Sequence, residues 1–255
     1  MRKFLSLLKR EWHLYKIWPF IALLVGVVFI GILPIFEYRF NNSFSEEDLR
    51  FQVMIIGIFF LGAVMPFQFI FSIRRDIRTK ELWLHNSSSI LVLIGVKLVY
   101  TLIWVMLMSF LYTIPFYFLE EIVTGTVISI FWMQLLIISI LFVLCILTCG
   151  IALLFYALYL QLKRYISYGS LLVTGVLFGS FLFGVDKVTT SDLYKQVLYH
   201  GEISLSVIER NMPEFKNGTF LLLGDMYIFE ELVVWLLMVL CFIAASKWIE
   251  RVVTR

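Results

Sequence analysis

The chain alternates between long apolar runs and short polar segments. A run of about 20 apolar residues can cross the ~30 Å hydrocarbon core of a bilayer as a helix. Six runs predict membrane-spanning helices, at residues 17–36, 51–73, 98–119, 127–160, 165–185 and 227–248. The fourth is too long for one upright span and too short for two spans with a turn. We interpret it as one long or tilted helix that continues into the cytoplasm.

The first sixteen residues show a different pattern. Their apolar side chains repeat at helical spacing, with basic residues on the other faces. The apolar positions are Met1, Phe4, Leu5, Leu8, Trp12 and Tyr15. This predicts an amphipathic helix in the cytoplasmic membrane interface. The alternative is the n-region of a signal peptide, but Glu11 and the lack of a small-x-small cleavage site after the first span favour the interfacial helix.

Two polar segments interrupt the apolar runs. Residues 74–97 form a charged amphipathic segment between the second and third spans. Residues 186–226 form the longest loop, in which Leu193, Val197 and Ile203 suggest short amphipathic helices. Residues 220–223 could dip back into the membrane.

Composition agrees with a membrane protein. Hydrophobic residues make up 61% of the chain, and the mean hydropathy is +0.94. A soluble domain could not cover so much apolar side chain with polar surface. With the N-terminus inside, 15 Lys and Arg residues fall on the cytoplasmic side and 6 on the outer side. The positive-inside rule therefore predicts one all-α domain over residues 1–255 with six spans and both termini cytoplasmic.

The sequence offers little for catalysis. The three cysteines lie in apolar runs, and the three histidines are scattered without zinc spacing, so we expect no metal site and no bound cofactor. No P-loop motif is present, so the chain does not hydrolyse ATP through one. The acid pairs Glu120–Glu121 and Glu230–Glu231 invite comparison with intramembrane metallopeptidases. Thr124 and Trp235 stand where those enzymes have arginine, so the pairs are interpreted as polar helix ends on the outer surface.

The polar residues within the predicted spans are neutral, among them Gln52, Gln68 and Thr174. A carrier coupled to protons or ions usually needs an ionisable group near the membrane midplane. We therefore expect that a transporter of this composition takes its energy from elsewhere and suits a hydrophobic or amphipathic cargo.

The order of these parts resembles the permease subunit of a type-2 ABC exporter (the ABC-2 class) over essentially the whole chain. The motif lies between the second and third spans, where the family tends to show an acid, a threonine and a short apolar helix. It comprises Arg75, Asp76, Arg78, Thr79, Lys80, Glu81, Leu82, Trp83 and Leu84. Many members follow it with a proline turn, whereas this chain has Asn86 and three serines. The sequence of residues 79–85 is similar to that of small permeases of Gram-positive bacteria. Those permeases act in cell-envelope stress and in export of amphipathic peptides, and they include the phenol-soluble-modulin exporters.

The resemblance implies that this segment is a coupling helix resting in a groove of a separate ATPase subunit. Leu82, Trp83 and Leu84 would supply an apolar contact, and the basic residues would pair with acids around the groove. The plainer alternative is a positive-inside loop with Trp83 at headgroup depth. Two copies of the ATPase, carrying ATP and magnesium, and a second permease or a paralogue are the implied partners, in a bacterial plasma membrane and without nucleic acid.

The implied function is outward transport of a peptide or lipid-like substrate by alternating access. By resemblance, the second and fifth spans line the pathway, with candidates Gln52, Phe67, Gln68, Thr174 and Phe178. The outer acids Glu120, Glu121, Glu230 and Glu231 could favour release of a cationic peptide, although topology alone also produces this asymmetry. The alternative function is a non-transporting sensor or scaffold subunit, or the substrate-binding component of a vitamin importer.

Overall fold

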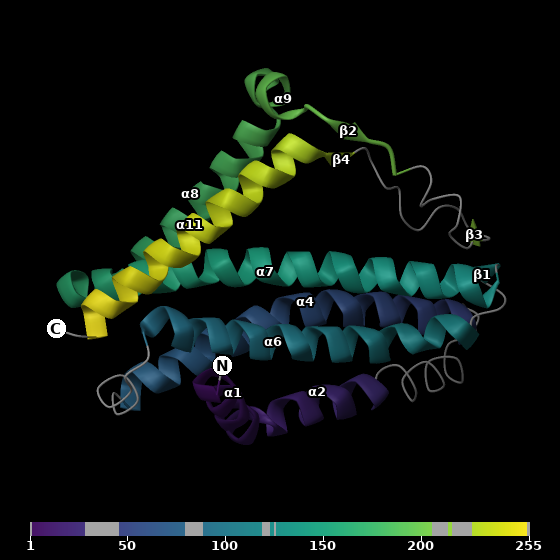
Figure 1. The fold of residues 1–255 in the computed structure, drawn as a ribbon, viewed down its shortest axis with the longest axis horizontal. Helices are drawn as coiled ribbons and strands as arrows, with labels where there is room; N and C mark the ends of the chain where they lie inside the picture. The colour runs from purple at the N-terminus through teal and green to yellow at the C-terminus, as the bar shows by residue number, and fades with distance from the viewer. Residues whose placement is uncertain are drawn as a thin grey trace. The chain divides into compact units, whose positions relative to one another are not determined.

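The computed structural model describes residues 2–28, 46–79, 89–118, 123–124, 126–205, 214–215 and 226–253. Almost all of these residues are helical (Figure 1). The helices are α1 (Arg2–Tyr15), α2 (Ile17–Val27), α4 (Glu46–Thr79), α6 (Ile90–Thr113), the 3-10 helix η2 (Ile114–Phe118), α7 (Val127–Ile166), α8 (Gly169–Thr189), α9 (Asp192–Leu198) and α11 (Ile228–Val253).

Two short antiparallel pairs accompany the helices. Strand β1 (Val123–Thr124) pairs with β3 (Glu214–Phe215), and β2 (Glu202–Ile203) pairs with β4 (Met226–Tyr227). The loop after α8 was predicted to form short helices only. The structure confirms one, α9, but places Ile203 in a strand, where its backbone pairs with that of Met226.

Five helices in the described part of the chain are long and apolar enough to cross a membrane. They are Ile55–Arg78, Ile90–Thr113, Val127–Ile166, Gly169–Thr189 and Ile228–Val252. Many of their apolar side chains are exposed, for example Leu171 at 72% and Leu236 at 61%. Such surface is unfavourable in water but is covered by lipid in a bilayer, so these helices define an all-α, multi-pass membrane protein. The first predicted span is described only as far as residue 28, so the count of six is not tested.

The helices extend beyond several predicted spans. Helix α4 continues to Thr79, because residues 74–79 contain no glycine or proline to stop it. Helix α6 begins at Ile90, and the Ser89 carbonyl accepts hydrogen bonds from the N–H groups of Val92 and Leu93, as an N-cap residue does. Both ends of the predicted coupling segment at residues 74–97 are therefore helical, at residues 74–79 and 90–97.

The run predicted as one long helix is one helix, α7, and it ends in a tight reversal. Ser167 has a φ of +48°, the left-handed conformation that commonly follows a helix C-terminus. Its carbonyl accepts hydrogen bonds from the backbone N–H of Ser170, at 3.4 Å, and from the Ser170 hydroxyl, at 2.7 Å. These bonds fix the start of α8.

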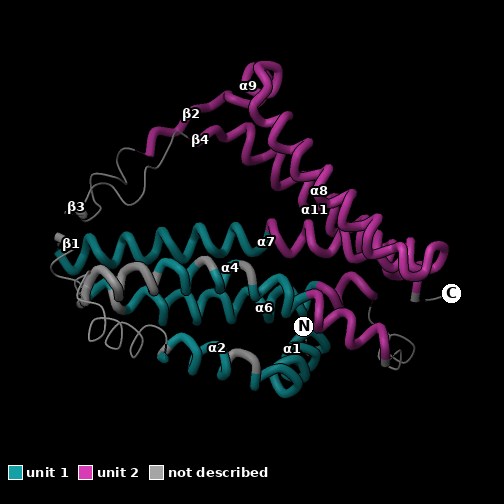
Figure 2. Tube along the Cα trace, turned by 180° about the vertical axis from the view of Figure 1, so that it is seen from behind, with its two compact units in different colours: residues 1–69, 95–146, 207–222 teal, residues 70–94, 147–206, 223–255 magenta. Residues whose placement is uncertain are grey.

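The chain forms two compact units (Figure 2). Unit 1 comprises Met1–Phe69, Gly95–Ile146 and Val207–Leu222, and unit 2 comprises Ile70–Ile94, Leu147–Ser206 and Leu223–Arg255. Fully buried side chains of unit 1 include Met65, Met108 and Met133. In unit 2 they include Leu153 and the small residues Ala157 and Ala245, which suit close helix packing.

Candidate functional site

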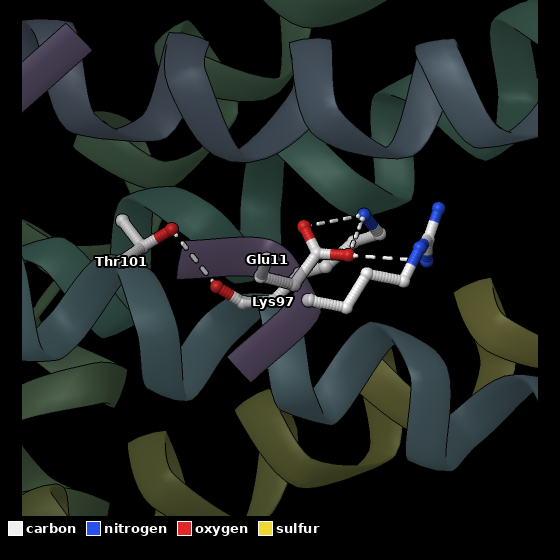
Figure 3. Close-up of polar contacts among 4 residues, drawn as sticks. Glu11, Lys97 and Thr101 are labelled. Atoms are coloured by element: carbon white, nitrogen blue, oxygen red, sulfur yellow. Dashed lines mark hydrogen bonds and ion pairs between the residues drawn. The ribbon is translucent and has the colours of Figure 1, made fainter. Parts of the chain in front are cut away.

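A buried ion pair joins α1 to α6 within unit 1 (Figure 3). The Lys97 ammonium donates hydrogen bonds to both carboxylate oxygens of Glu11, each at 2.9 Å. The two side chains are only 2% and 3% exposed, respectively. A guanidinium nitrogen of Arg10, which is half-exposed, lies 3.5 Å from one of the same oxygens. The pair therefore brings opposite charges together where neither is solvated.

Aromatic rings surround this pair. Trp12 of α1 stacks on Trp104 of α6, with ring centroids 5.1 Å apart and planes inclined by 12°. The Tyr15 ring lies 6.5 Å from that of Tyr100 and 5.7 Å from the Lys97 ammonium. Burial of both charged side chains keeps bulk water away from the ion pair, which strengthens the attraction between its charges.

Lys97 lies within α6, the helix that contains the predicted third span. The sequence placed this lysine in a cytoplasmic segment and left only neutral polar groups within the spans. In the structure, Lys97 follows Ile90 by seven residues and so lies about 10 Å inside α6. The detectable signal was an isolated lysine in an otherwise apolar run, which in a membrane helix is expected to have a partner. Its partner Glu11, 86 residues away, could not be read from the sequence.

The N-terminal helix forms as predicted, but another face of it packs on the protein. Leu7, Glu11 and Tyr15, spaced four residues apart, are its buried residues. Leu5 and Trp12 of the predicted apolar stripe are 59% and 41% exposed. Leu5 and Trp12 therefore remain accessible to lipid, while Tyr15, also part of the predicted stripe, is buried with Glu11 on the neighbouring face.

The structure describes only the beginning of the predicted coupling segment. Arg75 and Arg78 are exposed in the last turns of α4, whereas Asp76 is buried at 3% exposure. Burial of Asp76 favours an internal role for its carboxylate. Thr79 is the last residue of α4. The other five predicted docking residues, Lys80, Glu81, Leu82, Trp83 and Leu84, lie outside the described residues.

The pathway candidates fall into two groups, one in each unit. Gln52, Phe67 and Gln68 belong to α4 in unit 1; Phe67 is 77% exposed and Gln68 is half-buried. In unit 2, the Thr174 hydroxyl donates to the Ser170 carbonyl at 2.7 Å, and the Phe178 ring lies edge-on to Phe155 at 5.1 Å.

Of the outer acids, Glu230 and Glu231 are described and lie in the first turn of α11. The Tyr194 hydroxyl of α9 donates a 2.7 Å hydrogen bond to Glu230. Burial, this hydrogen bond and the two carboxylates raise the pKa of Tyr194 to about 12. Glu230 therefore helps to hold α9 on α11, a structural role that sequence reasoning did not predict. Glu120 and Glu121 lie outside the described residues.

The described residues contain no group of three or more His, Cys, Asp or Glu side chains that could hold a metal ion. Comparison with protein-family models, curated proteins and solved structures found no match to this chain. The length and apolar composition of its helices indicate a multi-pass membrane protein.

Proposed function

We propose that the chain is the transmembrane subunit of an ATP-driven exporter of the ABC-2 type. It moves a hydrophobic or amphipathic substrate, such as a peptide or lipid-like molecule, outward by alternating access. The observation that carries this proposal is the polar connection between α4 and α6. Helix α4 extends past its apolar portion and ends in exposed arginines, so charge is presented at the edge of the membrane immediately before the residue 80–84 segment.

The absence of a P-loop motif from the sequence supports an external energy source. Two copies of a separate ATPase supply it, holding ATP and magnesium. Arg78 is exposed, and its guanidinium pairs with acids of that subunit. Trp83, with Leu82 and Leu84, gives the apolar anchor that a specific interface needs.

The paired charges inside the protein favour a transport mechanism that is not coupled to ions. Lys97 is matched by the bidentate carboxylate of Glu11, so the pair contributes no net charge to the membrane interior. Gln52, Phe67, Gln68, Thr174 and Phe178 give a neutral lining to the proposed pathway, which forms between two permeases, either identical copies or paralogues. The assembly resides in a bacterial plasma membrane with both termini cytoplasmic.

Co-purification tests the proposal. The tagged chain is purified from its native membrane, as wild type and as Glu81→Ala and Trp83→Ala variants, and any P-loop ATPase that copurifies is identified by mass spectrometry. We expect wild type to retain the ATPase and both variants to lose most of it. Trp132→Ala, an exposed tryptophan in α7, is the matched control and is expected to bind normally. Equal binding by all variants refutes docking through this segment, and no ATPase at all favours a sensor, scaffold or importer component.

A further inference from the structure

Three side chains of α6 form one face of that helix, which we call the donor face. Tyr100 follows Lys97 by three residues and Trp104 follows it by seven, a spacing that places all three on one side. Lys97 meets Glu11 of α1 there, and the rings of Tyr100 and Trp104 meet aromatic rings of α1. The donor face is buried, because Lys97, Tyr100 and Trp104 are 2%, 4% and 5% exposed. All of these residues belong to unit 1.

Two polar atoms of the donor face have no hydrogen-bond partner among the residues that the structure describes. They are the Tyr100 hydroxyl oxygen and the Trp104 indole nitrogen, and both are shielded from solvent. The two rings are neighbours, edge-on to one another with centroids 6.3 Å apart. An indole N–H can only donate, so a turn of Trp104 toward the Tyr100 oxygen would still leave the tyrosine O–H without an acceptor.

The charged groups beside these atoms do not supply that acceptor. The Lys97 ammonium carries three N–H donors and no lone pair. The Glu11 carboxylate accepts hydrogen bonds, and each of its oxygens receives one from Lys97 at 2.9 Å. A buried donor that gives up its bond to water and gains no other is destabilising. The donor face therefore requires an acceptor beyond the described side chains.

Burial restricts this acceptor to a very small molecule. The side chains that enclose the donor face are each at most 5% exposed: Glu11, Tyr15, Lys97, Tyr100 and Trp104. A lipid headgroup or a transported substrate would have to separate α1 from α6 to reach the two donors. Water has two lone pairs that accept, and it is the usual partner of buried polar groups that side chains leave unmatched.

We propose that the interface between α1 and α6 contains an internal water molecule that accepts hydrogen bonds from the Tyr100 O–H and the Trp104 N–H. The water is a structural ligand of the donor face. It satisfies both donors at once and adds a polar contact next to the Glu11–Lys97 ion pair. This site is independent of the proposed exporter function.

Deleting one hydroxyl distinguishes a hydrated donor from an unmatched one. Tyr100→Phe keeps the ring and removes only the O–H. If water accepts this hydrogen, the variant loses a hydrogen bond, and we expect its unfolding equilibrium constant in detergent to rise by about 2–10-fold. If the hydroxyl is unmatched, the deletion removes an unfavourable buried donor. The constant then falls, and this result would overturn the proposal.

The matched control is Tyr112→Phe, because the Tyr112 hydroxyl donates directly to the Ala22 carbonyl at 3.1 Å. Its unfolding constant should rise by a similar factor. Replacing Trp104 by 3-benzothienylalanine removes the N–H and keeps the shape of the side chain. Since one water serves both donors, this replacement and Tyr100→Phe should have less than additive effects. With Tyr112→Phe the effects should add, and additivity with Tyr100→Phe as well would refute a shared water.

A crystal or electron-microscopy structure of the full chain, at a resolution that shows ordered water, tests the site directly. We expect density for one water within hydrogen-bonding distance of the Tyr100 hydroxyl and the Trp104 nitrogen. Empty space there, a lipid or detergent atom, or a protein group that accepts both hydrogens would each contradict the proposal. None of these measurements involves an ATPase, so the water site and the exporter function can fail separately.

Discussion

Glu11 and Lys97 are 86 residues apart in the sequence, yet their charged groups meet at 2.9 Å with both side chains buried. Removing two charges from water costs free energy that their attraction offsets only when the geometry is good. The bidentate contact meets this condition. It joins the N-terminal helix to α6 in one register, since a shift by one turn would leave both charges unmatched.

Removing one partner should be far more harmful than removing both. We expect Glu11→Gln or Lys97→Met alone to lower the free energy of unfolding by about 3–5 kcal/mol, because each removes the bidentate contact from a charge that stays buried. Glu11→Met/Lys97→Met should be within about 1 kcal/mol of wild type. Reversible unfolding in detergent, followed by tryptophan fluorescence, measures these differences. Single variants as stable as the double variant would mean that the pair is not buried in solution.

Gly26 of α2 should not tolerate a side chain. A Cβ at this position would collide with the Tyr112 hydroxyl, which donates a 3.1 Å hydrogen bond to the Ala22 carbonyl. We expect Gly26→Ala to lower the free energy of unfolding by about 1–3 kcal/mol, and the melting temperature falls with it. The control is Gly95→Ala, since a Cβ on Gly95 meets nothing within 4 Å. Equal melting temperatures for both variants would contradict the contact between α2 and Tyr112.

A polar network at the far end of α6 should contribute measurably to stability. The Gln134 side chain, 1% exposed, accepts a hydrogen bond from the Tyr117 hydroxyl at 2.8 Å and donates one to the Thr113 hydroxyl at 2.9 Å. Gln134→Leu should cost about 1–2 kcal/mol, as buried hydrogen bonds in membrane proteins do. Ser139→Ala is the control, because Ser139 is exposed and donates only to its own helix. If Gln134→Leu lowers the free energy of unfolding by no more than Ser139→Ala does, the network does not stabilise the protein.

The raised pKa of Tyr194 predicts a loss of stability in alkali. Tyr194 keeps its proton in the folded protein up to about pH 12, whereas in the unfolded chain it ionises near pH 10. The folded state thus binds more protons between these values, and its stability falls as pH rises through this window. Tyr194→Phe should lose less stability than wild type from pH 10 to 12, measured by unfolding at each pH. Parallel curves for the two proteins would contradict the hydrogen bond to Glu230.

Much of the fold could be predicted from the sequence because lipid imposes one rule on it. Backbone groups in the membrane must pair within the same helix, so apolar runs such as residues 127–160 identify helices directly. Helix ends were less predictable. Residues 74–79 are polar, but their residue types favour helix. The change from apolar to polar residues therefore marks the end of the apolar run and not the end of the helix.

The candidate site was the least predictable part. Periodicity identified the amphipathic character of α1 but selected the stripe containing Leu5 and Trp12. The helix instead packs through Glu11, because the Lys97 ammonium of α6 forms an ion pair with its carboxylate. Long-range pairs of this kind depend on tertiary contacts, which spacing within one segment does not contain. Likewise, α9 was predicted, but its bond from Tyr194 to Glu230 was not.

ATP-dependent uptake into inside-out vesicles tests the central claim most directly. Vesicles that contain the chain together with the P-loop ATPase that copurifies with it are incubated with a fluorescent amphipathic peptide. We predict that peptide accumulates inside only when ATP and magnesium are supplied, and that Trp83→Ala abolishes accumulation while Trp132→Ala does not. Accumulation without ATP, or none in the wild-type complex across amphipathic peptide and lipid-like substrates, would contradict the account.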